Sequence, residues 1–190
     1  VDLLCEYRRR HPGVSIEARL ENRLTDLVAE GIDVGLRLHT GEIPGDPGLM
    51  VRSLGQFSGG VFASPAYIKR RGLPREPNDL CEHDLAMHRA VVGRGLRFVS
   101  SGGEIQNVDA EQAVLESNDF GLLQGVVEAG GAIAVLPRLF VGDLERSGAI
   151  VRLLPDWTMP GGRLSLVWPA SRHLSPRVRA FIDLAAERLS

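Results

Sequence analysis

The sequence has few of the features that mark membrane, disulfide-rich or nucleic-acid-binding proteins. Its 190 residues include two cysteines, too few for a disulfide framework. No apolar run approaches the roughly 18 residues that a membrane span needs. The formal charge of −2 lacks the Lys and Arg surplus with which a free-standing DNA-binding domain neutralises phosphates. These absences favour a reduced, cytoplasmic setting, with no membrane partner and no DNA binding by this chain itself.

The chain also lacks the residue patterns that catalysis or metal binding requires. It has no phosphate loop, no G-x-S-x-G nucleophile elbow and no complete G-x-G-x-x-G fingerprint. The five histidines are scattered, and Cys81 with His83 and His88 does not make a convincing set of metal ligands. We therefore expect no catalytic residue, no metal site and no cofactor. Nothing indicates a reactive thiol environment, so Cys5 and Cys81 are expected to be small buried residues rather than redox sensors.

What the chain does contain is typical of a packed globular fold. Apolar residues make up 44% of the sequence and charged residues 24%. The first residues are already in helical rhythm, and no secretory signal pattern precedes them. We therefore expect a fragment whose beginning has been cut away.

The beginning of the chain alternates between helical and strand-like periodicity. Apolar spacing predicts a helix that ends before Pro12, followed by a strand over 14–20. Helical spacing returns over 24–31, and strand alternation returns over 32–38. Helix, strand, helix and strand in turn indicate a parallel sheet with crossover helices. The Gly- and Pro-rich residues 39–48 then form a loop at the end of the last strand, where ligand crevices border open α/β sheets.

The rest of the chain predicts a second lobe inserted into the first. Its middle is expected to carry antiparallel ribbons, and the final amphipathic helix returns to the first lobe. The expected strands are 49–54, 60–63, 86–91, 96–99, 104–108, 113–116, 132–136, 149–154 and 164–168. The expected helices are 65–72, a short one capped by Asn78, 118–129, 137–146 and 176–189.

Several motifs, in order along the chain, resemble one family. The longest is ENRLTDLVAEGIDVGLR at 21–37, followed by ASPAYI at 63–68 and GAIAVLP at 131–137. LPDW at 154–157 and RHLSPRVRAFID at 172–183 match as well. Together they closely resemble the effector-binding region of LysR-type transcriptional regulators, and the resemblance covers essentially the whole chain.

The resemblance implies a type 2 periplasmic-binding-protein-like fold, an α/β architecture of two lobes whose mixed sheets are flanked by helices. Two crossover strands join the lobes, and a small-molecule effector is expected in the cleft between them. Lobe I would comprise 1–63 and 170–190, and the inserted lobe II would comprise 64–169. The family's N-terminal winged helix-turn-helix and the first strand of lobe I are absent from this chain. DNA contact is therefore expected only through that missing domain.

Three candidate effector contacts lie near the ends of strands in the first half of the chain. Ser64 precedes Pro65 at a helix start, where a hydroxyl and backbone donors suit a polar or anionic ligand. Position alone explains Ser64 equally well as a helix cap, and the resemblance raises the ligand interpretation. Arg37 and Leu38 end a strand beside the Gly/Pro loop, where Arg37 is either a partner for a carboxylate or a surface charge.

Three further candidates lie in the second half of the chain. Asn118 and Asp119 open a helix, for which capping is the more frequent role and ligand contact the rarer one. Ile133 follows Gly131 and Ala132, where the backbone could approach a ligand, although a buried strand explains this segment as well.

The first helix and the expected helix over 118–129 have apolar residues on more than one face. One face can therefore pack on the sheet and the other on a partner. The resemblance implies a homodimer in which these helices pair across subunits, and possibly a tetramer of the full-length protein. The candidate interface residues are Leu3, Leu4, Tyr7, Phe120, Leu123 and Val127.

Two other functions are compatible with the same scaffold. A periplasmic-type solute-binding protein would need a secretory signal, and an enzyme would need a nucleophile, a base and a stabilising group that converge. The sequence shows neither. Effector-controlled transcription is therefore the favoured function, and the solute-binding protein is the alternative.

Overall fold

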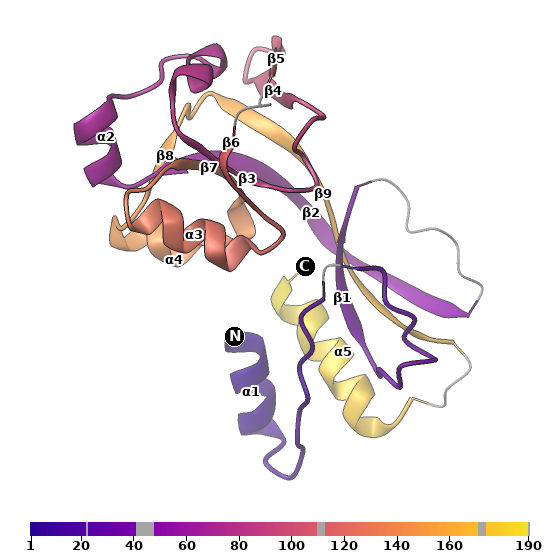
Figure 1. Cartoon of the computed structure of the whole chain (residues 1–190). Helices are drawn as coiled ribbons and strands as arrows, with labels where there is room; N and C mark the ends of the chain where they lie inside the picture. Colours follow the sequence, from indigo (N-terminus) through magenta and orange to yellow (C-terminus); the bar gives the residue numbers. More distant parts are fainter. Residues whose placement is uncertain (22, 41–47, 110–112, 171–173, 190) are drawn as a thin grey trace. The chain divides into compact units, whose positions relative to one another are not determined.

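The computed structural model describes residues 1–21, 23–40, 48–109, 113–170 and 174–189. The backbone divides into two compact units: unit 1 is Val1–Gln56 with Gly162–Ser190, and unit 2 is Phe57–Gly161. Two long strands, β2 (Leu49–Ala63) and β9 (Trp157–Pro169), run through both units (Figure 1). The division falls inside these continuous strands, whereas the sequence suggested lobe boundaries at 63/64 and 169/170. Gly55 of β2 and Pro160 to Gly162 of β9 lie at the division, but glycine and proline inside a strand do not by themselves show where one unit ends.

Unit 2 is built from short helices and strands. Its helices are α2 (Pro65–Arg71), the 3-10 helix η1 (Pro77–Glu82), α3 (Phe120–Glu128) and α4 (Arg138–Ser147). Its own strands are β3 (Leu85–His88), β4 (Leu96–Ser100), β5 (Ile105–Val108), β6 (Ala113–Ser117), β7 (Ile133–Pro137) and β8 (Val151–Leu153). With β2 and β9 they follow the hydrogen-bonded order β5-β4-β9-β2-β7-β3-β6, and β8 pairs with β2.

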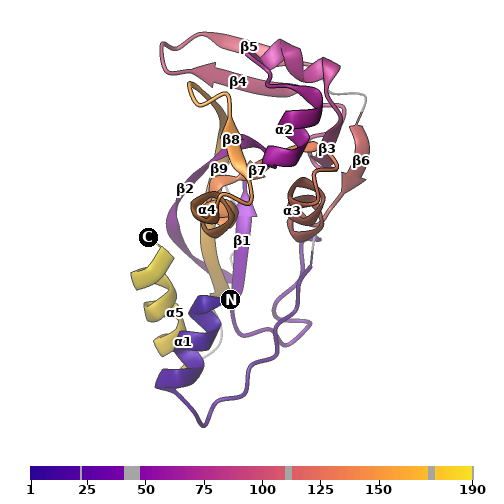
Figure 2. The same cartoon turned by 90° about the vertical axis from the view of Figure 1, so that its left-hand side faces the viewer.

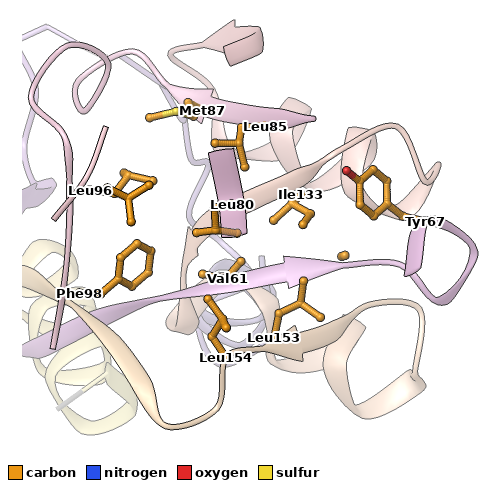
Figure 3. Close-up of a cluster of buried hydrophobic side chains, with 12 residues drawn as sticks. Val61, Tyr67, Leu80, Leu85, Met87, Leu96, Phe98, Ile133, Leu153 and Leu154 are labelled. Carbon is orange, nitrogen blue, oxygen red and sulfur yellow. The ribbon is translucent and has the colours of Figure 1, made fainter. Parts of the chain in front are cut away.

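Alternation along the strands of unit 2 sends side chains to both faces of its sheet. On β2, Val61 belongs to one buried apolar cluster and its neighbour Phe62 to another. Figure 3 shows the first cluster spread along β2, with Phe98 at one end and Tyr67 at the other. The second cluster contains side chains of both α3 and α4, so these two helices cover the same face.

Three strands of unit 2 run parallel to one another. On β3, His88 lies opposite Ser117 of β6, and Leu85 lies opposite Ile133 of β7, both in parallel pairing. β2 runs antiparallel to β7. The expected antiparallel ribbon is present between β4 and β5, but the inclusion of β3 in it is wrong, because β3 is an interior parallel strand.

Unit 1 contains α1 (Asp2–Arg10), β1 (Gly35–His39) and α5 (Pro176–Leu189). Two views show α1 alongside α5 (Figures 1 and 2). The Tyr7 hydroxyl donates to the Arg177 carbonyl oxygen at 2.8 Å, and the Tyr7 ring meets Phe181 edge-on. Glu6 accepts a hydrogen bond from Arg188 of α5, and this bond holds the pKa of the Glu6 carboxyl below its usual value. No helix in the described parts of either unit is long and apolar enough to cross a bilayer.

The expected strand over 14–20 is not a strand in the structure. Although its apolar residues alternate, it pairs with no strand among the described residues, and Leu20 is 95% exposed. A strand needs a hydrogen-bonded neighbour, and alternation within one segment cannot supply it.

The expected helix over 24–31 is reduced to a single turn. Within that turn the Asp26 carboxylate accepts hydrogen bonds from the backbone N–H groups of Val28 and Ala29. Leu27 is buried, but Leu24 is 73% exposed. With so little apolar packing, the cost of nucleating a longer helix is not offset.

β1 differs from the expected strand in direction and in exposure. It pairs antiparallel with β9, with Leu38 opposite Leu164, so the parallel sheet expected at the beginning of the chain is wrong. Leu36 and Leu38 share one face as expected, but they are 46% and 36% exposed. The opposite face packs inward, where Gly35 lies against Val167. Residues 41–47 of the expected Gly/Pro loop lie outside the described residues.

Both cysteines are exposed, so the expectation that they are buried is wrong. Cys5 is two positions from Tyr7 on α1 and therefore points away from the face that packs on α5. Cys81 lies in η1, whose buried side chains include Leu80.

The short helix η1 is not capped by Asn78. Glu76 occupies the N-cap position, and the Asp79 carboxylate accepts hydrogen bonds from the backbone N–H groups of Arg75 and Glu76. These bonds, the one from Arg75 first, lower the pKa of the Asp79 carboxyl.

Two glycines lie where β9 passes from unit 2 to unit 1. A Cβ atom on Gly161 would lie 1.9 Å from the Phe57 carbonyl oxygen, and one on Gly162 would lie 2.1 Å from the His39 carbonyl oxygen. Neither position has room for a side chain, so glycine permits the close approach of β9 to β2 and to β1.

Candidate functional site

The parallel strands of unit 2 end at one edge of its sheet. β3, β6 and β7 end there at His88, Ser117 and Pro137. β2 enters unit 2 at the same edge, because its Gly59 lies opposite Pro137. We call this the connecting edge. Ligands of open α/β sheets bind outside the carboxyl ends of parallel strands, so the connecting edge is the candidate site in unit 2.

Backbone groups hold both ring nitrogens of His88 at this edge. The N–H of Ala90 donates to Nδ1 at 3.2 Å, and Nε2 lies 3.1 Å from the Asn118 carbonyl oxygen. A nitrogen that accepts a hydrogen bond carries no proton, so Nε2 carries it and donates to Asn118. These two contacts select one neutral tautomer and fix the plane of the ring.

The N-terminus of α3 lies beside His88. Asp119 is its cap, because the Asp119 Oδ1 accepts from the backbone N–H of Leu122 at 2.7 Å. Asn118, expected as the cap, lies one residue outside the helix and contributes its carbonyl oxygen to His88. The first turn of a helix has backbone N–H groups without intrahelical partners. Those that Asp119 does not bind can donate to ligand oxygens, while the Asp119 charge opposes an anion placed directly beside it.

Three aromatic rings form a row at the connecting edge. His88 stacks on Phe120, with centroids 4.3 Å apart and planes 19° apart, and Phe120 lies 5.5 Å from Phe140. Gln124 of α3 donates to the Phe140 carbonyl oxygen at 2.7 Å and so ties α3 to α4. The next residue after His88 is Arg89, which is exposed and forms no ion pair within the described part of the chain.

The structure does not bring Ser64 and Ile133 to this edge. β2 runs antiparallel to β7, so Ser64 follows the end of β2 at the opposite edge of the sheet, where β7 begins with Ile133. Ser64 is 3% exposed and its hydroxyl accepts from the backbone N–H of Tyr67 as a helix cap. Ile133 is fully buried in the core, and its N–H donates to the Asp84 carbonyl oxygen. Grouping them with Asn118 is wrong, because it assumed that β2 runs parallel to its neighbours.

Arg37 and Leu38 lie in unit 1, on β1. β1 ends at His39, opposite Arg163, close to the point where β9 enters unit 1. The Arg37 Nη2 donates to the Thr25 carbonyl oxygen at 2.7 Å, so the guanidinium anchors the turn that precedes β1. Leu38 is partly exposed.

Comparisons with known proteins identify the family. The model of the LysR substrate binding domain matches residues 1–190, the whole chain. The chain belongs to this family. An HTH-type transcriptional regulator of Xanthomonas campestris pv. campestris (strain 8004) is 32% identical, over 99% of this chain and 55% of that protein. YhjC, an HTH-type transcriptional regulator of Escherichia coli (strain K12), is 31% identical, over 96% of this chain and 60% of that protein. The chain thus spans less than two thirds of these relatives.

Solved structures of LysR-type regulators share the fold. The regulatory domain of CrgA from Neisseria meningitidis has a TM-score of 0.83 at 20% identity, over 100% of this chain and 91% of that one. Full-length AphB from Vibrio cholerae has a TM-score of 0.81 at 20% identity, over 100% of this chain and 63% of that one. The expected α/β fold, type 2 periplasmic-binding-protein-like, is confirmed. The family and these relatives are regulators, not enzymes.

Three of the six interface residues expected from the LysR-type resemblance are buried, and the other three are partly exposed. Leu123 and Val127 of α3 are fully buried against the sheet, and Tyr7 is buried against α5. Leu3 packs against the core of unit 1, and Phe120 packs against the second cluster of unit 2. Leu4 is half-buried. The exposed large apolar residues on α3 and α4 are instead Leu122, Leu139 and Phe140.

Sequence reasoning did not single out His88 and Arg89 as candidate effector contacts of this LysR-type domain. They are marked only by their position, because His88 is the last residue of β3 and Arg89 follows it. That signal has meaning only if β3 is parallel to its neighbours, and the sequence predicted the opposite. His88 is not a metal ligand, because both ring nitrogens are engaged, and the described residues contain no group of three or more His, Cys, Asp or Glu that could hold a metal ion.

Proposed function

We propose that this chain is the effector-sensing part of a cytoplasmic LysR-type transcription regulator. It binds a small polar or anionic molecule at the connecting edge of unit 2. The observation that carries the proposal is that three parallel strand ends, the α3 N-terminus and Arg89, which forms no ion pair with a described residue, meet at that edge. Arg37 and Leu38 lie in unit 1, on β1, and are not assigned to this site.

The chemistry of the edge suits a ligand with oxygen acceptors. First-turn N–H groups of α3 donate hydrogen bonds, and the Arg89 guanidinium offers a planar fork that matches a carboxylate. The Asp119 carboxylate repels an anion from its own side of the helix start. A carboxylate is therefore best accommodated on the Arg89 side, with a neutral part of the ligand toward Asp119.

Binding would regulate transcription through a change in assembly. We propose that the effector shifts an equilibrium between two arrangements of a homodimer, or of a tetramer of the full-length protein. DNA is contacted by a part of the regulator outside this chain. The exposed residues Leu122, Leu139 and Phe140 replace the buried Leu123 and Val127 as the apolar surface proposed for self-association.

A thermal-shift screen of small carboxylates on the full-length regulator tests the site. A ligand that binds only the folded state at a hundred times its dissociation constant adds about 2.7 kcal/mol of stability. We expect Arg89→Gln to weaken ligand binding about ten-fold, as the loss of a charge-assisted contact does.

Ser64→Ala is the matched control. It removes the cap of α2 and lowers the baseline stability by about 1 kcal/mol, but the ligand-induced shift should be unchanged because Ser64 lies at the opposite edge. A ligand whose affinity is unaffected by Arg89→Gln, or is lost in Ser64→Ala, would contradict the assignment.

A further inference from the structure

The His88 ring joins two loops at the connecting edge. One is the turn after β3, whose Ala90 N–H donates to Nδ1 of the ring at 3.2 Å. The other is the link from β6 to α3, whose Asn118 carbonyl oxygen lies 3.1 Å from Nε2. The ring also stacks on Phe120, the first residue of α3. One side chain therefore ties the turn after β3 to the start of α3.

Backbone hydrogen bonds hold the rest of the turn after β3. The Val91 N–H donates to the His88 carbonyl oxygen at 2.9 Å and closes the turn. The Arg89 N–H donates to the Ser117 carbonyl oxygen at 2.8 Å and continues the parallel pairing of β3 with β6. Within the described part of the chain, the Ala90 N–H has the imidazole as its sole partner. Whether this N–H is bound to the protein therefore depends on the state of the ring.

The bond from Ala90 requires that the His88 ring is neutral. Nδ1 accepts a hydrogen bond only while it carries no proton, and histidine is the side chain that changes its charge between about pH 8 and 5. On protonation, Nδ1 becomes a donor that faces another donor, so the bond from Ala90 is lost. Nε2 keeps its proton and its bond to Asn118. Protonation thus frees the turn and leaves the ring attached to the α3 side.

The charged groups on the segments packed against the ring do not replace the lost bond. Arg89 follows His88 on the turn and opposes a second positive charge. Glu116 and Asp119 lie on either side of the contact with the ring and favour that charge, but neither forms a hydrogen bond or ion pair with it. Glu128 lies at the far end of α3, and β7, the other neighbour of β3, has no titratable residue.

We propose that His88 is a pH-sensitive latch on the connecting edge. The neutral ring ties residues 89–91 to the start of α3, and the protonated ring releases them. The latch is a property of the fold and goes beyond the proposed function. Its regulatory consequence rests on that function, because the released turn carries Arg89, the proposed ligand contact. Proton uptake and effector binding then act on the same turn.

NMR spectroscopy of the ligand-free chain tests the latch. At about pH 8, long-range ¹H–¹⁵N spectra should show an unprotonated Nδ1 and a protonated Nε2 on His88. As the pH is lowered to about 5, the Ala90 amide signal should shift along the same titration curve as the ring. The protection of this amide against hydrogen exchange, corrected for the intrinsic effect of pH, should fall about three- to ten-fold, as expected for the loss of one exposed hydrogen bond.

Two substitutions separate the effect of the proton from that of the ring stack. His88→Asn keeps an acceptor for the N–H two residues on, as asparagine does in Asx turns, and does not titrate. The Ala90 amide should therefore stay protected over the whole pH range. His88→Phe keeps an aromatic ring beside Phe120 but has no acceptor, so the same amide should be unprotected throughout. Thermal unfolding confirms that both variants are folded.

Three results would overturn the latch. The first is a proton on Nδ1 rather than on Nε2 of His88 at about pH 8. The second is an Ala90 amide whose protection does not follow the titration of the ring, and the third is an equal loss of protection in His88→Asn. The test needs no effector, so its failure leaves the proposed function standing. A carboxylate screen without a stabilising ligand would count against the proposed function and not against the latch.

Discussion

At the scale of single residues, His83 couples the stability of unit 2 to pH. The buried Tyr67 hydroxyl accepts from the Asp84 N–H at 2.9 Å and so directs its own proton to His83 Nδ1, 3.3 Å away. Protonation of His83 would place two donors against each other. Partial burial, and to a lesser degree Arg71, lower the pKa of His83 below its usual value.

We predict that the free energy of unfolding falls as the pH is lowered from 7.5 to 5.5. Since the folded pKa of His83 is depressed, its contribution is complete above the unfolded pKa of about 6.5 and is lost as the pH falls through the lower folded value. Chemical denaturation at several pH values measures this. His83→Asn keeps an acceptor near the Nδ1 position without titrating, so it should fall less steeply; an identical pH dependence would rule out His83 as the cause.

We predict that Gly161→Ala destabilises the chain by about 1–3 kcal/mol, the usual cost of forcing atoms into a packed site. The added Cβ would meet the Phe57 carbonyl oxygen, and neither strand can move without disturbing its pairing. Gly142→Ala is the matched control, because Gly142 is in α4 with nothing within 4 Å of its Cβ position. It should stabilise by about 0.5–1 kcal/mol. Equilibrium denaturation of both variants decides between a specific clash and a general effect of alanine.

At the scale of elements, α1 depends on its contacts with α5. We predict that Tyr7→Phe lowers the stability of unit 1 by about 1 kcal/mol, because it leaves the Arg177 carbonyl oxygen without the hydroxyl donor. Hydrogen exchange of the α1 amides should increase in this variant. Cys5→Ser, on the exposed side of the same helix, should change stability by less than about 0.5 kcal/mol. Equal effects of the two substitutions would contradict this account of α1.

Elements held by local signals could be predicted from the sequence. The first and last helices, α2 with its glycine stop and the buried β7 lie close to where periodicity and punctuation place them. Features that depend on distant partners could not. Residues 14–20 alternate correctly yet find no neighbouring strand among those described. The direction of β3 decides which edge carries the candidate site. The four residues of this strand do not indicate whether it pairs parallel or antiparallel, so the sequence could not predict that edge.

At the scale of the whole molecule, the low net charge limits what the chain does alone. We predict no sequence-specific DNA binding by this chain, which has a net charge of −2 and, in the part that the structure describes, no recognition helix. A gel-shift assay at low salt measures it, with a scrambled DNA of the same length as control. Affinity that depends on the DNA sequence would contradict the prediction.

Self-association is expected to depend on exposed rather than buried apolar residues. We predict that sedimentation at tens of micromolar, a concentration at which interfaces of ordinary affinity are occupied, shows a dimer. Leu122→Asp should shift it toward monomer, because Leu122 is exposed on α3 and the substitution leaves the core intact. Ile105→Asp, equally exposed on β5, is the control and should remain dimeric. A wild-type chain that is monomeric under these conditions would contradict the prediction.

The exposure of Cys5 and Cys81 has a practical consequence for spectroscopy. One thiol lies in unit 1 and the other in unit 2, and the sequence has no further cysteine. The natural chain can therefore be coupled to a pair of fluorophores or spin labels without any substitution. The distance between the two labels can then be measured while an effector is titrated into the sample.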